Sequence, residues 1–176
     1  MGRLVLAGNV SLDGYINDAE GNIDFSDPDD EVHQFWNDFD NRYDTHVYGR
    51  RLYEVMAFWE TYDSDNPVMA EYGAMWRRQQ KIVVSSTLES VSTGNTTLWR
   101  DLSGLPDLLA QGDATIGGPT LAAQVADLLT DIELVLVPVM LGGGTAFWPP
   151  VRETFEFVES TAFTSGQVHL HYRKAL

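Results

Sequence analysis

The sequence contains no cysteine, and only two of its 176 residues are lysine. Without cysteine there is no disulfide framework, no thiolate-bound zinc or iron–sulfur cluster and no thiol nucleophile, so redox chemistry would need a dissociable cofactor. No run approaches the roughly 18 apolar residues of a membrane span, and the first residues do not form the hydrophobic segment of a secretory signal. We therefore expect a cytoplasmic protein.

Basic residues are scarce: 11 Lys and Arg face 26 Asp and Glu, which gives a formal net charge of −15. A surface this negative repels phosphate backbones and anionic lipid, so we expect neither a nucleic-acid nor a membrane partner. Hydrophobic residues make up 44% of the chain and aromatic residues 11%. This composition and length predict a single domain over residues 1–176 with a sizeable core.

Apolar residues recur with helical spacing in some segments and with strand spacing in others. One helical face is formed by Val32, Phe35, Trp36 and Phe39, after an acidic first turn at 29–31. Helices are predicted at 29–39, 52–59, 67–76, 105–110 and 121–128. Strands are predicted at 4–10, 45–48, 81–85, 97–99, 114–116, 132–139, 154–163 and 167–172.

The order of these segments predicts an α/β fold. Strands and helices alternate through most of the chain, and the last two strands are separated only by a short turn with Ser165-Gly166. Alternation of this kind favours a mainly parallel sheet with helices on both faces, and the short turn favours an antiparallel hairpin at the C-terminal edge.

Three predicted strand ends carry residues suited to phosphate: Gly-Gly-Pro-Thr at 117–120, Gly-Arg-Arg at 49–51 and Ser-Ser-Thr at 85–87. Glycines let the backbone approach an anion, and the first turn of a following helix directs N–H groups toward it. Each segment also has a plainer interpretation. A Gly-Gly pair forms a tight turn, arginines solvate a helix surface, and hydroxyls cap turns.

Five segments in register resemble the dihydrofolate reductase-like superfamily. They are Ser-Leu-Asp-Gly at 11–14, Gly-Arg-Arg-Leu-Tyr-Glu at 49–54, Lys-Ile-Val-Val-Ser-Ser at 81–86, Ile-Gly-Gly-Pro-Thr-Leu at 116–121 and Pro-Val-Met-Leu-Gly-Gly-Gly at 138–144. Nearly the whole chain is covered. The branch it resembles most is the C-terminal reductase domain of the riboflavin-biosynthesis deaminase/reductase.

This resemblance implies a three-layer fold with a mixed sheet of about eight strands that binds NADPH across its strand ends. The implied nicotinamide neighbours are Asn9, Asp13, Ile16 and Asn17. The implied phosphate neighbours are Gly49, Arg50, Arg51 and Leu52. Ser85, Ser86, Thr87 and Arg100 would lie near the adenosine 2′-phosphate. The pyrophosphate would be wrapped by Ile116, Gly117, Gly118, Pro119, Thr120 and Leu121. The resemblance also implies a homodimer.

On the substrate side, a reductase of this type aligns its ligands and excludes water, because the cofactor supplies the hydride. Candidate catalytic proton donors are Asp13, Asp30 and His33, with Glu31 beside them. Asp13 is interpreted equally well as a turn anchor before a glycine. His33 lies off the apolar helical face, so we expect it to be exposed. Aromatic residues at 36, 53, 58 and 59 would stack a planar substrate or belong to the core.

We predict an NADPH-dependent reductase that acts on a small heteroaromatic substrate, pterin-like or ribosylaminopyrimidine-like. A true dihydrofolate reductase is one alternative, although Pro138 stands where that enzyme has a Thr. A non-catalytic nucleotide-binding or interaction protein on the same fold is another. No metal is expected, because His169 and His171 share one strand face without a carboxylate nearby in sequence.

Overall fold

A computed structural model describes residues 1–175, and its centre is an eight-stranded sheet in the order β4-β3-β2-β5-β1-β6-β8-β7. The six strands β1 to β6 pair in parallel, while β8 runs antiparallel to β6 and to β7. The strands are β1 (Leu4–Ser11), β2 (Thr45–Gly49), β3 (Gln80–Val84), β4 (Thr96–Trp99), β5 (Ala114–Gly117), β6 (Asp131–Val137), β7 (Phe155–Ala162) and β8 (Val168–Lys174). The predicted mixed sheet with a C-terminal hairpin is confirmed.

The longer helices begin where the sequence supplies a cap. Asp29 Oδ1 accepts from the Val32 N–H at 2.9 Å, and Asn66 Oδ1 accepts from the Val68 N–H at 2.9 Å, so each satisfies an N–H of the first turn. The helices are α1 (Asp30–Asp40), α2 (Arg50–Met56), α3 (Pro67–Arg78), α4 (Leu105–Leu109) and α5 (Pro119–Ala122), with 3₁₀ turns η1 (Asp24–Ser26), η2 (Ala57–Glu60) and η3 (Ala123–Val125). Within residues 1–175, no helix has the length and apolar composition that a bilayer crossing requires.

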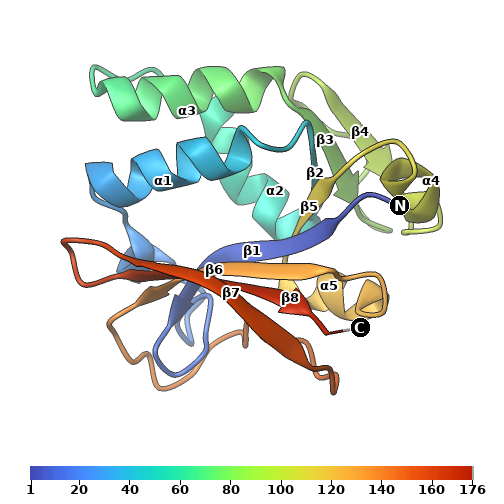
Figure 1. The fold of residues 1–176 in the computed structure, drawn as a ribbon. Helices are drawn as coiled ribbons and strands as arrows, with labels where there is room; N and C mark the ends of the chain where they lie inside the picture. Colours follow the sequence, from blue (N-terminus) through green and yellow to red (C-terminus); the bar gives the residue numbers. More distant parts are fainter. Residues whose placement is uncertain (176) are drawn as a thin grey trace.

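Helices cover both faces of the sheet (Figure 1). Alternate side chains of β1 pack on opposite faces of the sheet. Leu4 and Leu6 pack in the main core with α4 and α5, while Val5 packs with Phe39 of α1. The side of α2 and α3 has its own core around Tyr48, Trp76 and neighbouring residues. Because strand side chains alternate between faces, one strand contributes to both layers.

The order of elements is as predicted, and the differences lie at their ends. The predicted strand 132–139 ends at Val137, because Pro138 has no N–H for the ladder. The predicted helix 52–59 begins earlier, at Arg50, and its last part is the 3₁₀ turn η2. The predicted helix 121–128 is shorter, since α5 ends at Ala122 and continues as η3.

Candidate functional site

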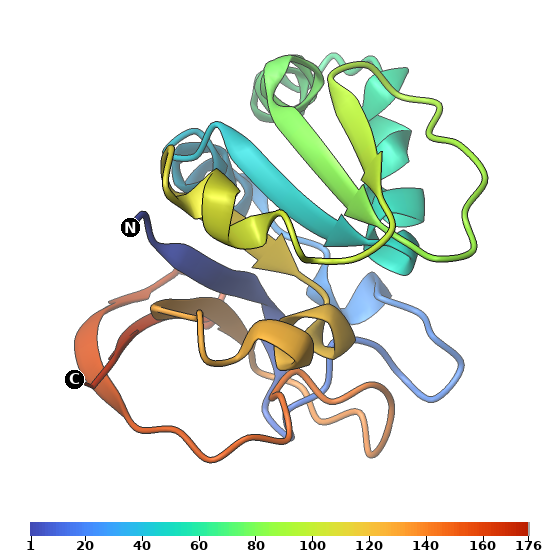
Figure 2. The same ribbon diagram turned by 90° about the vertical axis from the view of Figure 1, so that its right-hand side faces the viewer.

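The two glycine-containing strand ends of β2 and β5 lie next to each other at the carboxyl edge of the sheet. Tyr48 pairs with Gly117, and β5 lies between β2 and β1 (Figure 2). A Cβ on Gly117 would overlap Leu52 Cδ2, so the Leu52 side chain of α2 lies directly against this strand end. A Cβ on Gly49 would lie 3.9 Å from Leu121. The segments 49–52 and 116–121 therefore form one surface.

Gly118 leaves open space at the centre of this surface. Its φ of 97° and ψ of 115° are values that L-residues rarely adopt. No atom of residues 1–175, its chain neighbours apart, lies within 4 Å of the position a Cβ would take. In α5, which follows directly, Pro119 has no N–H, and the Leu121 and Ala122 N–H groups donate to the Gly118 carbonyl at 3.1 and 3.0 Å, so the Thr120 N–H is the donor that the first turn leaves over. A backbone donor and free volume thus meet where the sequence predicts a phosphate.

The third predicted segment, 85–87, is joined to this surface through arginine side chains. Arg50 donates from Nε to Glu54 at 2.7 Å and from Nη1 to Thr87 Oγ1 at 3.2 Å. Arg100 Nη1 donates to the carbonyl oxygens of Ser85 at 3.2 Å and Leu88 at 2.5 Å, and so fastens the loop after β3. The structure therefore brings all three predicted phosphate segments to one edge.

The side chains of the loop after β3 differ in burial. The Ser85 hydroxyl accepts from the Leu88 N–H at 3.0 Å and is buried, as in the turn-capping interpretation. Ser86, Thr87 and Arg51 are exposed. Exposed groups at the edge remain free to contact a ligand, whereas Ser85 shapes the loop.

The loop after β1 is held by Asp13. Its carboxylate accepts from the Ser11 hydroxyl at 2.7 Å and from the N–H groups of Leu141 at 3.1 Å and Gly142 at 2.7 Å. The Ser11 hydroxyl, followed by the Leu141 N–H, lowers the pKa of Asp13 to about 2. These contacts are those of an anchor between two loops, and they match the turn interpretation of Asp13.

The other residues predicted near the nicotinamide lie near the carboxyl end of β1 and in the loop that follows it. Asn9 Oδ1 accepts from Trp36 Nε1 at 3.0 Å, and the Ile16 N–H donates to the Thr145 carbonyl at 2.9 Å. Asn17 Oδ1 accepts from the Thr145 N–H at 2.8 Å. The loops after β1 and β6 are therefore one hydrogen-bonded unit next to the end of β1.

A cleft of about 280 Å³ opens between the sheet and the layer formed by α1, α2 and α3. It extends from the carboxyl edge, at Gly117 and Leu52, to the last turn of α1. Its lining residues are Ala7, Gly8, Asn9, Ile23, Pro28, His33, Trp36, Asp40, His46, Tyr48, Leu52, Val55, Met56, Trp59, Tyr72, Thr115, Ile116 and Gly117. Most are apolar or aromatic, as is typical of a small-molecule site.

Four polar side chains meet at the inner end of this cleft. The Tyr72 hydroxyl donates to Asp40 Oδ2 at 2.6 Å, and Thr115 Oγ1 lies 2.8 Å from His46 Nδ1. Asp40 Oδ1 is 3.8 Å from the same His46 nitrogen. Burial raises the pKa of Asp40 and lowers the pKa of His46, so the uncharged forms of both are favoured. Burial and the nearby Asp40 also raise the pKa of Tyr72.

The three predicted catalytic residues lie in three different places. His33 lines the cleft and is only 8% exposed, so the expectation of an exposed side chain was wrong. It is enclosed because α1 packs against α3 and η2, where its ring contacts Trp59 and Tyr72 edge to face. Asp30 is exposed and accepts from Asn66 Nδ2 at 2.8 Å, outside the cleft lining. Asp13 belongs to the loop anchor.

Asp40, His46, Tyr72 and Thr115 were not among the residues proposed from the sequence. A signal was present in the strands: His46 and Thr115 interrupt the apolar alternation of β2 and β5, and they are direct register partners. Polar residues on two buried strands indicate a shared polar contact. Asp40 had no comparable signal, because an acidic residue at the end of a helix is usually solvated.

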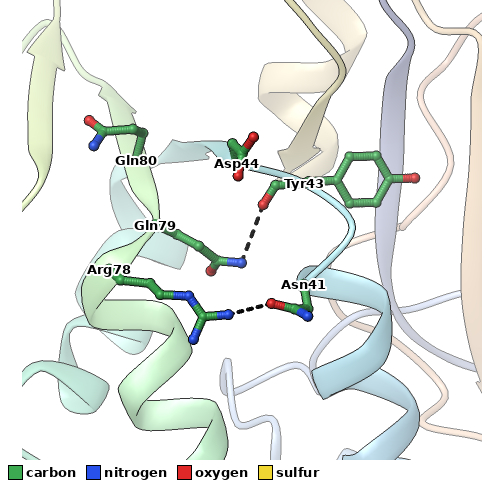
Figure 3. Close-up of a pocket in the computed structure, with 6 residues that line it drawn as sticks. All are labelled: Asn41, Tyr43, Asp44, Arg78, Gln79 and Gln80. Carbon is green, nitrogen blue, oxygen red and sulfur yellow. Dashed lines mark hydrogen bonds between the residues drawn. The ribbon is translucent and has the colours of Figure 1, made fainter.

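A second hollow, of about 330 Å³, lies at the opposite, amino end of β2 and β3 (Figure 3). Arg78 donates to Asn41 across it, and Gln79 Nε2 donates to the Tyr43 carbonyl at 3.3 Å. Ligands of open α/β sheets bind beyond the carboxyl ends of strands. We therefore interpret this hollow as part of the structural contact between the residues that follow α1 and those at the end of α3, rather than as a ligand site.

His169 and His171 meet carboxylates that are distant in sequence. His169 Nε2 lies 3.2 Å from Glu133 Oε2, and His171 Nε2 lies 2.7 Å from Asp131 Oδ1. Arg42 donates to Glu133 at 2.9 Å. Within residues 1–175, no three His, Asp or Glu side chains are arranged to hold a metal ion. The cluster is thus a largely buried set of polar contacts that joins β6 and β8 to Arg42, just after α1.

Comparisons with known proteins agree with this architecture. No family model matches the chain. The protein YyaP of Bacillus subtilis, whose function is uncharacterised, is 25% identical over 97% of this chain and 94% of its own length. A crystal structure of a protein named for riboflavin biosynthesis, from Shewanella sp. PV-4, is 21% identical, with a TM-score of 0.69 over 100% of both chains.

Two further structures represent the two branches considered from the sequence. The deaminase/5-amino-6-(5-phosphoribosylamino)uracil reductase of Thermotoga maritima is 12% identical, with a TM-score of 0.67 over 99% of this chain and 57% of its own. Dihydrofolate reductase from Enterococcus faecalis, complexed with NADP(H) and RAB-propyl, is 15% identical, with a TM-score of 0.65 over 98% and 96%. The predicted resemblance is confirmed in the fold: the chain has the dihydrofolate reductase-like fold, which these solved structures share.

Proposed function

We propose that the protein is an NADPH-dependent oxidoreductase that reduces a small heteroaromatic substrate. The observation that carries this proposal is the continuity of two features. The open surface around Gly118, with Arg50 and Arg51 beside it, leads directly into the cleft at Gly117 and Leu52. A cofactor on the edge and a substrate in the cleft would therefore meet.

The edge fits a nicotinamide dinucleotide phosphate. Free volume at Gly118 lets the backbone approach a pyrophosphate, and Arg51 is exposed for charge-assisted hydrogen bonds. Ser86, Thr87 and Arg50 would hold the 2′-phosphate, because the Arg50 guanidinium already reaches the Thr87 hydroxyl. Bound there, the cofactor would supply a hydride.

The chain's own contribution is alignment and exclusion of water. Trp36 and Trp59 belong to the cleft lining and would contact the substrate, and the Trp36 indole N–H donates to Asn9 Oδ1 at 3.0 Å. The titratable side chains of the lining are His33, Asp40, His46, Tyr48 and Tyr72, and of the predicted proton donors only His33 is among them. We therefore transfer the proton-donor role from Asp13 and Asp30 to this set.

Titration calorimetry with NADPH tests the cofactor assignment. Arg51→Gln should raise the dissociation constant about tenfold, because one charge-assisted contact is lost. Arg152→Gln is a matched control, since it removes the same charge from another exposed position. Absence of NADPH binding by the unaltered protein, or equal effects of the two substitutions, would contradict the proposal.

We also propose that the protein is a homodimer, as the resemblance implies. Edge strand β7 presents Phe157, 59% exposed, and Val158, 41% exposed, and its outer backbone groups face no neighbouring strand of residues 1–175. Exposed apolar residues on an unpaired edge favour association. Sedimentation equilibrium should give twice the chain mass, and Phe157→Lys should give the monomer. A monomeric unaltered protein would contradict this assignment.

A further inference from the structure

The substrate cleft has no basic side chain. None of the 11 Lys and Arg residues belongs to its lining, and Arg51, which precedes the lining residue Leu52, is exposed at the edge that is proposed to hold the cofactor. Other arginines of the surrounding elements have partners elsewhere. Arg42 binds Glu133, Arg50 binds Glu54 and Thr87, and Arg77 donates to the Trp59 carbonyl. An anion in the cleft would lose its hydration without gaining a cation.

The walls of the inner cleft are aromatic. The ring centroids of Trp59 and Tyr72 are 4.7 Å apart, and that of His33 lies 5.7 Å from Trp59 and 5.5 Å from Tyr72. Trp36 lines the facing part of the same cleft. Ring faces and edges of this kind favour a flat, apolar or heteroaromatic guest.

One polar atom at the inner end remains without a hydrogen-bond donor. Asp40 Oδ2 is occupied by the Tyr72 hydroxyl, whereas no donor of residues 1–175 bonds Oδ1, whose nearest ring nitrogen is 3.8 Å away on His46. The Asp40 side chain is 14% exposed, and the cleft is where it lies open. A ligand N–H would satisfy this oxygen, whereas a phosphate or carboxylate presents acceptor oxygens and would leave it unpaired.

We propose that the cleft selects an uncharged planar nitrogen heterocycle with an N–H edge directed at Asp40, and that it excludes the same ring when a phosphate or carboxylate tail is attached. The inference rests on the proposed function for the role of this heterocycle as substrate. It narrows that function, because a ribosylaminopyrimidine phosphate and a glutamate-bearing folate both carry such tails. The phosphate-binding arginines remain at the edge, where they serve the cofactor.

Two matched ligand pairs test this selection. One is 6-hydroxymethylpterin with its diphosphate ester, and the other is 5-amino-6-ribitylaminouracil with its 5′-phosphate. Binding is followed by quenching of cleft tryptophan fluorescence, with and without saturating NADPH. We expect at least one phosphate-free ligand to bind, at least tenfold more tightly than its phosphorylated partner. Equal or tighter binding of the phosphorylated forms, or no binding of either phosphate-free ring up to millimolar concentration, would overturn the proposal.

Variants locate the selection in the cleft. Asp40→Asn should weaken binding of the phosphate-free ring about tenfold, while Asp38→Asn, on an exposed position of the same helix, should leave it unchanged. Val55→Lys places a cation at a cleft residue that is 47% exposed, so it should reduce the discrimination against phosphate; Val55→Gln is its uncharged control. Unaltered discrimination in Val55→Lys together with full binding by Asp40→Asn would refute the assignment.

NADPH binding tests the proposed oxidoreductase function independently of ligand selection by the cleft. If the phosphate-free ligand binds and NADPH does not, the proposed oxidoreductase function fails while the selection by the cleft stands. If NADPH binds and the phosphorylated ligand is preferred, the selection fails and the cofactor assignment stands.

Discussion

Replacing Gly118 with alanine separates backbone strain from cofactor binding. The φ of 97° and ψ of 115° lie outside the regions open to alanine, which costs about 1–3 kcal/mol of folding free energy. No collision adds to this cost, because no atom of residues 1–175 beyond the adjoining residues lies within 4 Å of the new Cβ. For a chain of this length, the loss corresponds to a melting temperature lower by roughly 2–12 °C.

The same methyl group would stand where the pyrophosphate is proposed to approach. NADPH affinity should therefore fall at least tenfold, which is about 1.4 kcal/mol. Urea denaturation measures the first effect, and calorimetric titration of the folded variant measures the second.

Gly166→Ala is the matched control for this substitution. Gly166 has a φ of +85° in the turn between β7 and β8, and its new Cβ would meet only Pro138 Cγ at 3.9 Å. It should lose similar stability and keep its NADPH affinity. Unchanged affinity in Gly118→Ala would refute the proposed cradle. A loss of stability below about 0.5 kcal/mol would refute the strain argument.

Three further predictions concern charged groups. Glu133→Gln should cost about 1–3 kcal/mol at pH 7 by chemical denaturation, because the buried carboxylate that Arg42 and His169 contact is lost while Arg42 stays partly solvated; Glu153→Gln, whose carboxylate is more exposed, should cost less than about 1 kcal/mol. Contacts with His169 and Arg42 outweigh the effect of burial and lower the pKa of Glu133 in the folded state. Its contribution to the free energy of unfolding is therefore present above the pKa that it has in the unfolded chain, and is lost as pH falls through its lower pKa in the folded state. Glu133→Gln should reduce this loss of stability at acid pH. Burial lowers the pKa of Lys81 to about 8, so between about pH 8 and 10 the unfolded chain binds more protons than the folded chain. The free energy of unfolding should therefore rise over this range, by at most about 1.4 kcal/mol per pH unit. A free energy of unfolding that does not change over this range would contradict the prediction. NADPH affinity should stay constant or rise from about 50 to 300 mM NaCl, since salt screens repulsion by the net charge of −15; a steep loss would count against the local positive edge.

Local sequence predicted the elements well where one physical rule dominates. The predicted helices 29–39 and 67–76 lie within a residue or two of α1 and α3, and Asp29 and Asn66 cap their starts. The glycines at 117–118 could also be predicted, since a strand-to-helix turn at a sheet edge needs close approach. The ends of β6 and α2 were less predictable, because the hydrophobic pattern continues past both: Pro138 ends the ladder after Val137, and the helix continues after Met56 as a 3₁₀ turn.

The inner end of the cleft could not be predicted in the same way. Its polar contacts join residues 32 and 69 positions apart in the chain: Asp40 with Tyr72, and His46 with Thr115. The parallel register of β2 and β5 decides which side chains meet, and register is a property of the sheet rather than of either strand. His33 shows the same limit. Its exposure depends on α3 and η2, which close over a helical face that is polar in sequence.

The positions of the cations and of the cleft together restrict how two ligands can share this site. A cofactor with several phosphates needs Arg50 and Arg51 at the edge, because the net charge of −15 otherwise opposes its approach. A substrate phosphate near the cleft mouth would have to compete for the same two guanidinium groups, since the lining offers no other cation. An uncharged ring would avoid this competition: burial and ring contacts would hold it in the cleft, and the edge would be left to the cofactor. The separation of charge between edge and cleft is therefore the physical reason why cofactor and substrate would bind together rather than displace each other.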